Sequence, residues 1–226
     1  MDEHTLEIAG LRTLLVRSTA APRLAVVVLH GYAMVPEDLS PFAASLGVPA
    51  EFYFPEGPLA AEPAGRAWWP IDGAERAAAV ASGPRDLAAQ HPSGAPSARA
   101  RLLAFLEAVR LRSGRLSLAL VGFSQGGMLA ADTLLREQVA VAALALLSSS
   151  RICADEWRPL VHRLHRTPVL VSHGRLDQDL AFSAGEALRD LLALAGGPVT
   201  WVPHEQGHVI PLAVWRQLRK FLAALG

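Results

Sequence analysis

The segment 122–127 has the sequence Gly-Phe-Ser-Gln-Gly-Gly, which places a serine between two glycines in the pattern G-x-S-x-G. This pattern is typical of a nucleophile elbow, a tight strand-to-helix turn on which the serine has strained backbone angles. Side chains at positions 122 and 126 would collide with the neighbouring strand or helix, and glycine avoids both collisions. A helix that begins near Gln125 directs its free N–H groups toward the serine oxygen. The chemistry favoured here is nucleophilic attack by Ser124, with stabilisation of the oxyanion that forms.

A serine hydroxyl is a poor nucleophile until a base accepts its proton, and an imidazole base needs an anion to fix its tautomer. Two such partners follow Ser124 in the chain. Asp177 follows an apolar run at 168–172, and His208 follows another at 198–203. We interpret them as orienting acid and general base. Asp179 is the competing acid, and we interpret it as an acid at the N-terminus of the next helix.

An oxyanion needs two backbone N–H donors, one from the residue after the nucleophile and one from a loop after an early strand. Gln125 supplies the first. Tyr32 supplies the second, because it follows the apolar run 24–29 and a glycine that allows close approach to a ligand. A simple exit turn at this position is the alternative. We interpret His30 as structural.

G-x-S-x-G also arises by chance and in nucleotide-binding folds, so the elements that position these residues decide its meaning. From residue 97 onward, amphipathic segments alternate with short apolar runs. We expect helices at 97–112, 125–136, 155–165, 182–194 and 211–224, and strands at 116–121, 141–147, 168–172 and 198–203. Before them we expect two strands within 5–18, strands at 24–29 and 51–54, and a helix at 36–46.

This alternation predicts an α/β fold: parallel strands joined by right-handed crossovers, with helices on both faces of the sheet. Ligands bind beyond the carboxyl ends of such strands, which is where Ser124, Asp177 and His208 fall. A length of 226 residues fits one domain, 1–226. The exception is a segment at about 55–96, rich in Pro, Gly and Ala, which we expect to be an irregular, lid-like insertion with a short helix at 75–81.

Composition argues against several other classes of protein. Lys+Arg and Asp+Glu both number 21, so there is no basic excess for nucleic acid. Cys153 is the only cysteine, which rules out an internal disulfide and fits a reducing cytoplasm. Cys153 lies outside the groups above, so we do not expect it to be a reactive thiol.

The chain also offers no sequence signal for a membrane or a metal. The first residues are acidic where a signal peptide would be basic, and apolar runs such as 139–147 are shorter than the roughly 20 residues that cross a bilayer. We therefore expect a cytoplasmic protein without membrane insertion. There is no His-Glu-x-x-His motif and no cysteine cluster, so no metal or other cofactor is expected.

These segments together resemble the α/β-hydrolase fold and, within it, the phospholipase/carboxylesterase family that includes acyl-protein thioesterases. The matching segments are 29–32 (Leu-His-Gly-Tyr) with 37–39, 122–127, 173–177 (His-Gly-Arg-Leu-Asp) and 207–210 (Gly-His-Val-Ile). The resemblance implies a cofactor-free esterase that acts through an acyl-enzyme on small-molecule esters, with short to medium acyl chains favoured. It implies that Ser124, Asp177 and His208 form a triad and that Tyr32 and Gln125 donate to the oxyanion.

The resemblance also suggests that Trp68 and Trp69 border the acyl pocket, although the sequence that follows them departs from the family pattern. The alternative is that these tryptophans only pack the loop onto the core. Two rival functions remain open: acyl transfer to an alcohol or peroxide by the same triad, and a catalytically silent binding protein that uses the Trp68-Trp69 loop. Apolar surface on the helices leaves a homodimer open.

Overall fold

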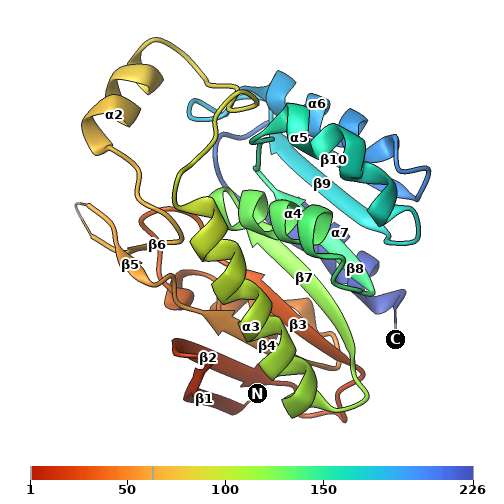
Figure 1. Cartoon of the computed structure of the whole chain (residues 1–226). Helices are drawn as coiled ribbons and strands as arrows, with labels where there is room; N and C mark the ends of the chain where they lie inside the picture. Colours follow the sequence, from red (N-terminus) through yellow and green to blue (C-terminus); the bar gives the residue numbers. More distant parts are fainter. Residues whose placement is uncertain (1, 63, 226) are drawn as a thin grey trace.

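A computed structural model describes residues 2–62 and 64–225. Its centre is an eight-stranded sheet in the order β1-β2-β4-β3-β7-β8-β9-β10 (Figure 1). The strands are β1 (Asp2–Ile8), β2 (Leu11–Arg17), β3 (Leu24–Leu29), β4 (Ala50–Pro55), β7 (Ser117–Phe123), β8 (Ala143–Leu147), β9 (Val169–Gly174) and β10 (Val199–His204). β2 pairs antiparallel with β1 and β4, and the other neighbours pair parallel. The predicted mostly parallel α/β sheet is confirmed.

Helices cover both faces of this sheet. The helices, of which α2 stands apart from the sheet, are α1 (Pro41–Leu46), α2 (Gly73–Ala81), α3 (Ala95–Ser113), α4 (Gln125–Glu137), α5 (Ala154–Trp157), α6 (Phe182–Ala193) and α7 (Leu212–Ala223). Apolar side chains of α3, α4 and α6 belong to one buried cluster, and those of α1 and α7 belong to another. The central strands are apolar along nearly their whole length because both of their faces are buried.

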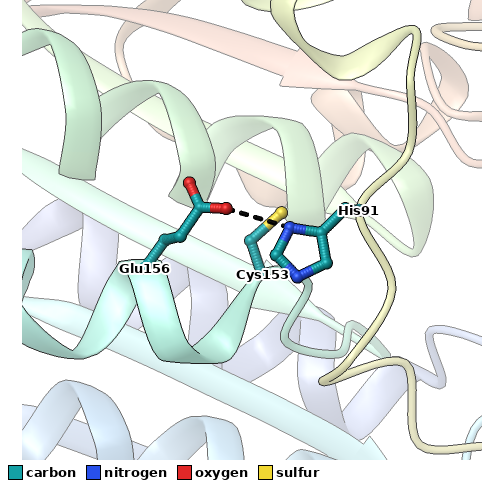
Figure 2. A group of neighbouring side chains, drawn as sticks. All are labelled: His91, Cys153 and Glu156. Atoms are coloured by element: carbon teal, nitrogen blue, oxygen red, sulfur yellow. Dashed lines mark ion pairs between the residues drawn. The ribbon is translucent and has the colours of Figure 1, made fainter.

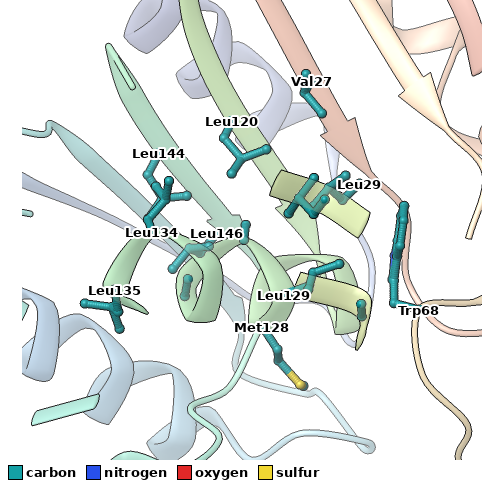
Figure 3. Packing of buried hydrophobic residues seen from close by; sticks show 14 of the residues in the cluster. Val27, Leu29, Trp68, Leu120, Met128, Leu129, Leu134, Leu135, Leu144 and Leu146 are labelled. Atoms are coloured by element: carbon teal, nitrogen blue, oxygen red, sulfur yellow. The ribbon is translucent and has the colours of Figure 1, made fainter. Parts of the chain in front are cut away.

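Alternate residues of a strand contact opposite clusters, as the period of two requires. In β7, Leu120 packs under α4 while Val121 packs toward α7. Figure 3 shows the α4 side of the core, where Leu120 and Leu146 from the sheet meet Leu129 and other α4 side chains. This packing fixes the start of α4 against the end of β7, and Ser124 lies between them.

Two predicted helices are shorter in the structure than the sequence suggested. The expected helix 36–46 is a 3₁₀ turn, Pro36–Asp38, followed by α1, and the expected helix 155–165 is α5 followed by a 3₁₀ segment, Arg158–Leu164. Pro41 and Pro159 explain both differences. Proline lacks the N–H that an α-helix interior needs, and its ring clashes with the preceding turn.

The segment 55–96 contains two short paired strands, β5 (Leu59–Ala60) and β6 (Arg66–Ala67), and the helix α2. Figure 1 shows α2 standing apart from the sheet and its other helices. No residue of α2 is buried. The chain after α2 returns to the body through Arg85, whose backbone pairs with Asp179 and Ala181.

Candidate active site

Ser124 lies on the sharp turn between β7 and α4. Its backbone angles, φ 51° and ψ −118°, belong to a region that residues with a side chain rarely adopt. A Cβ added at Gly122 would lie 2.4 Å from the Gly126 carbonyl oxygen, and one at Gly126 would lie 2.5 Å from the Leu29 carbonyl oxygen. Both contacts are with backbone, which cannot easily move. The steric reason predicted for the two glycines is confirmed.

The three residues predicted at successive strand ends lie together. His208 Nε2 is 3.0 Å from Ser124 Oγ, and His208 Nδ1 is 2.7 Å from Asp177 Oδ2. Asp177 follows β9 and His208 follows β10, so both come from the carboxyl edge of the parallel strands, beside the elbow after β7. The hydroxyl, imidazole and carboxylate form one hydrogen-bonded chain.

The Asp177 carboxylate is buried, and both of its oxygens accept hydrogen bonds. Its Oδ1 accepts hydrogen bonds of 2.9 Å from the backbone N–H groups of Asp179 and Leu180, while Oδ2 faces His208. Burial acts to raise the pKa of Asp177, but the bond with His208 and the two backbone donors outweigh it, and the pKa lies below its ordinary value. The carboxylate is therefore ionised and fixed, as an anion that orients an imidazole must be.

His173 lies next to the Asp177 carboxylate, a position for which the sequence analysis assigned it no role. Its side chain is fully buried, with Nε2 3.0 Å from the Leu180 carbonyl oxygen and 3.4 Å from Asp177 Oδ2. Burial lowers the pKa of His173, so the ring is neutral and Nε2 is the donor to Leu180. The sequence feature that could have indicated this role of His173 is its position at the end of β9, four residues before Asp177.

Asp179 has different partners from those expected. The sequence suggested an acid at the N-terminus of a helix, whereas α6 begins only at Phe182. The Asp179 carboxylate instead forms ion pairs with Arg76 of α2 and with Arg85. Because these arginines come from the irregular segment 55–96, Asp179 ties that segment to the loop after β9.

The two proposed oxyanion donors lie on the same cavity as the serine. Tyr32, Ser124, Gln125 and His208 all line it. Gln125 is the first residue of α4, a position whose backbone N–H has no acceptor within the helix. Its side chain is used elsewhere: Oε1 accepts from the Trp68 N–H and Nε2 donates to the Trp69 carbonyl oxygen, each at 2.9 Å.

His30 holds the loop that carries Tyr32. Its Nδ1 donates to the Gly31 carbonyl oxygen at 2.7 Å, and its Nε2 accepts from the Gly57 N–H at 2.8 Å. Burial lowers the pKa of His30, which keeps the ring neutral and able to donate on one side and accept on the other. These contacts match the structural interpretation of His30.

The cavity beside Ser124 has a volume of about 610 Å³. Trp69 lines it, whereas Trp68 is packed in the core and donates its ring N–H to the His30 carbonyl oxygen at 2.8 Å. For Trp68, the structure therefore favours the alternative interpretation, in which the tryptophan packs the loop onto the core and does not line the pocket. The apolar part of the wall includes Trp69, Ile71, Leu87, Met128, Ile152 and Leu180.

Within residues 2–62 and 64–225, no helix is both long enough and apolar enough to cross a membrane.

Comparisons with known proteins find similarity to esterases and thioesterases. A family model described as Phospholipase/Carboxylesterase matches residues 105–225. The structure of a carboxylesterase from Mesorhizobium loti is 21% identical, with a TM-score of 0.76 over 99% of each chain. Acyl-protein thioesterase 2 of Zea mays is also 21% identical, with a TM-score of 0.76 over 95% of this chain and 99% of its own.

An esterase named PE8 is 24% identical, with a TM-score of 0.79 over 96% of this chain and 99% of its own. A search of curated proteins found no match. At these identities the solved structures establish the α/β-hydrolase fold, and the family model, which spans more than half of the chain, establishes the family. The chain belongs to the phospholipase/carboxylesterase family and is a carboxylesterase-type hydrolase.

Proposed function

We propose that Ser124, His208 and Asp177 cleave carboxylic esters through an acyl-enzyme. The observation that carries this proposal is the unbroken chain of hydrogen bonds from Ser124 Oγ through the His208 ring to Asp177 Oδ2. In the first step His208 Nε2 accepts the serine proton as Oγ attacks the ester carbonyl carbon. Asp177 stabilises the imidazolium that forms, without itself taking the proton.

The carbonyl oxygen becomes negatively charged in the tetrahedral intermediate, and the backbone N–H groups of Tyr32 and Gln125 are the proposed donors to it. The intermediate collapses when His208 gives its proton to the departing alcohol or thiol. His208 then takes a proton from water, whose oxygen attacks the acyl-enzyme, and the acid leaves as the serine proton is restored. These steps need no metal or organic cofactor.

The substrate class proposed is a small ester, or a thioester, with a short to medium acyl chain. The cavity supports this choice, because its apolar wall begins beside Ser124 and includes Met128 and Leu180. We propose Trp69 as a contact for the acyl chain. The segment 55–96 supplies much of this wall, which gives the irregular part of the proposed single domain a function.

Hydrolysis of p-nitrophenyl butyrate tests the proposal. Ser124→Ala should lower kcat by on the order of 10⁴, leaving what binding and the oxyanion donors supply. Ser97→Ala, which changes an exposed serine on α3, is the matched control and should retain full turnover. Equal turnover by wild type and Ser124→Ala would contradict the proposal.

A further inference from the structure

Three metal-ligand side chains gather where the segment after α2 meets α5. They are His91, Cys153 and Glu156, and they point toward one another in Figure 2. One ligand atom of each lies within 4.8 Å of the other two. The closest pair is His91 Nδ1 and Glu156 Oε1, 2.9 Å apart.

These spacings approach what a zinc ion requires. Zinc binds histidine nitrogen and carboxylate oxygen at about 2.0–2.2 Å and cysteine sulfur at about 2.3 Å, in a tetrahedron, so its ligands lie roughly 3.3–3.7 Å from one another. The three side chains therefore need only small adjustments to surround one ion. A thiolate with an imidazole and a carboxylate also favours zinc over magnesium or calcium, which prefer oxygen ligands.

The backbone holds the two segments in place independently of any ion. Cys153 N–H donates to the Gln90 carbonyl oxygen, and Ala154 N–H donates to the Ala88 carbonyl oxygen, each at 2.9 Å. Cys153 itself has φ 46°, a left-handed conformation that is uncommon for a residue with a side chain. The Gln90 carbonyl oxygen helps to hold this conformation, because it accepts hydrogen bonds from the Cys153 N–H and, at 3.5 Å, from Cys153 Sγ.

The surrounding charges suit a dication. Glu156 Oε2 binds Arg136 at 2.8 Å, which orients the carboxylate and leaves Oε1 toward His91. Arg136 also pairs with the buried Asp132, with Nε 2.7 Å from Oδ1, and Asp132 in turn binds Arg99. Asp155 Oδ1 lies 3.6 Å from Nε2 of His91, the ring nitrogen not facing Glu156. Carboxylates in this position commonly orient histidines that bind zinc through the other nitrogen.

We propose that His91, Cys153 and Glu156 bind one Zn²⁺ or a chemically similar divalent cation, with the fourth position open to water. Binding replaces the thiol proton of Cys153, which is released to solvent, and no oxidation takes place.

The site would act on the proposed acyl pocket through its wall. Leu87, Gln90 and His91 belong to the segment after α2, and all three line the cavity beside Ser124. A metal ion that joins His91 to Cys153 and Glu156 would fasten this wall to the body of the protein. The metal site itself does not depend on the mechanism proposed for Ser124, because none of its ligands is in the triad.

Cobalt titration of the tag-free, chelator-treated and reduced protein tests the site. Wild type should bind one equivalent of Co²⁺ with a thiolate-to-cobalt charge-transfer band, which added Zn²⁺ should abolish. Cys153→Ser and Cys153→Ala should lack the band. His91→Ala and Glu156→Gln should each weaken binding by at least about tenfold. His165→Ala, at an exposed histidine elsewhere, should bind as wild type does.

Thermal unfolding provides a second measurement that does not depend on catalysis. Zn²⁺ should raise the Tm of wild type and of His165→Ala but not that of His91→Ala, because an ion bound only by the folded state stabilises it. A wild-type protein without the charge-transfer band would overturn the proposal. Unchanged cobalt affinity in folded His91→Ala and Glu156→Gln would overturn it as well.

Discussion

Asp177 and Asp179 are two residues apart, yet their carboxylates have separate partners. Asp177 faces His208, and Asp179 is held between two arginines. The backbone N–H of Asp179 nevertheless donates to Asp177 Oδ1 at 2.9 Å. One short loop therefore supplies both the acid of the proposed triad and the tie to the segment 55–96.

Replacing these two acids should separate their roles. Asp177→Asn should lower kcat by on the order of 10⁴, because an amide favours the wrong tautomer of His208. Asp179→Asn keeps the backbone donor and should reduce kcat much less. Steady-state hydrolysis of p-nitrophenyl butyrate measures both effects. A severe effect of Asp179→Asn with a mild effect of Asp177→Asn would show that Asp179, and not Asp177, is the acid of the triad.

The lowered pKa of Asp177 predicts how stability depends on pH. A carboxyl group whose pKa is depressed on folding contributes stability above its unfolded pKa, which is about 3.9, and loses that contribution as the pH falls through the lower folded value. Urea unfolding between about pH 5 and pH 2 should therefore show a decline in the free energy of unfolding. The decline should be shallower in Asp177→Asn, and an identical pH dependence in the two proteins would contradict this account.

The elbow glycines can be tested by adding a methyl group. Gly126→Ala would place Cβ 2.5 Å from the Leu29 carbonyl oxygen and should lower the free energy of unfolding by about 3 kcal/mol or abolish folding. Gly73→Ala is the matched control, because a Cβ there meets nothing within 4 Å. Urea denaturation compares them, and equal stability of the two variants would show that the close contact is easily relieved.

The helix α2 should be the part of the pocket wall most easily released. It buries no residue, and its ion pair with the body joins Arg76 to Asp179. Because Arg76 is partly exposed, the pair should be worth no more than about 1 kcal/mol, so Arg76→Ala should speed amide exchange in 73–81 without unfolding the sheet. Arg101→Ala, at an exposed position on α3, should leave that exchange unchanged. Equal exchange in both variants would show that other contacts hold α2.

Much of this fold follows from local pattern. The regular alternation after residue 97 predicted the strands and helices because the strands are mainly apolar and the helices present an apolar face to the sheet. Placing Ser124, Asp177 and His208 at strand ends needed only the rule that parallel strands share a carboxyl edge. Proline limited the prediction at 36–46 and 155–165, where it converts part of a helix to a 3₁₀ turn.

Contacts between distant segments could not be predicted in the same way. Asp179 pairs with Arg76 and Arg85, which are roughly a hundred residues away in the sequence. The local sequence favours the simpler interpretation of Asp179 as an acid at the N-terminus of a helix. His91 and Cys153 are 62 residues apart, so no metal motif is visible along the chain. Trp68 and Trp69 are adjacent, and only the fold shows that Trp69 lines the cavity while Trp68 does not.

A fluorophosphonate probe with peptide mass mapping tests the central claim most directly, because the probe reacts with a serine only when a base activates it. The account predicts one adduct per chain, located on Ser124, that is lost in Ser124→Ala and strongly slowed in His208→Ala. A folded protein that gives no adduct, or one that is labelled on a different serine, would contradict it.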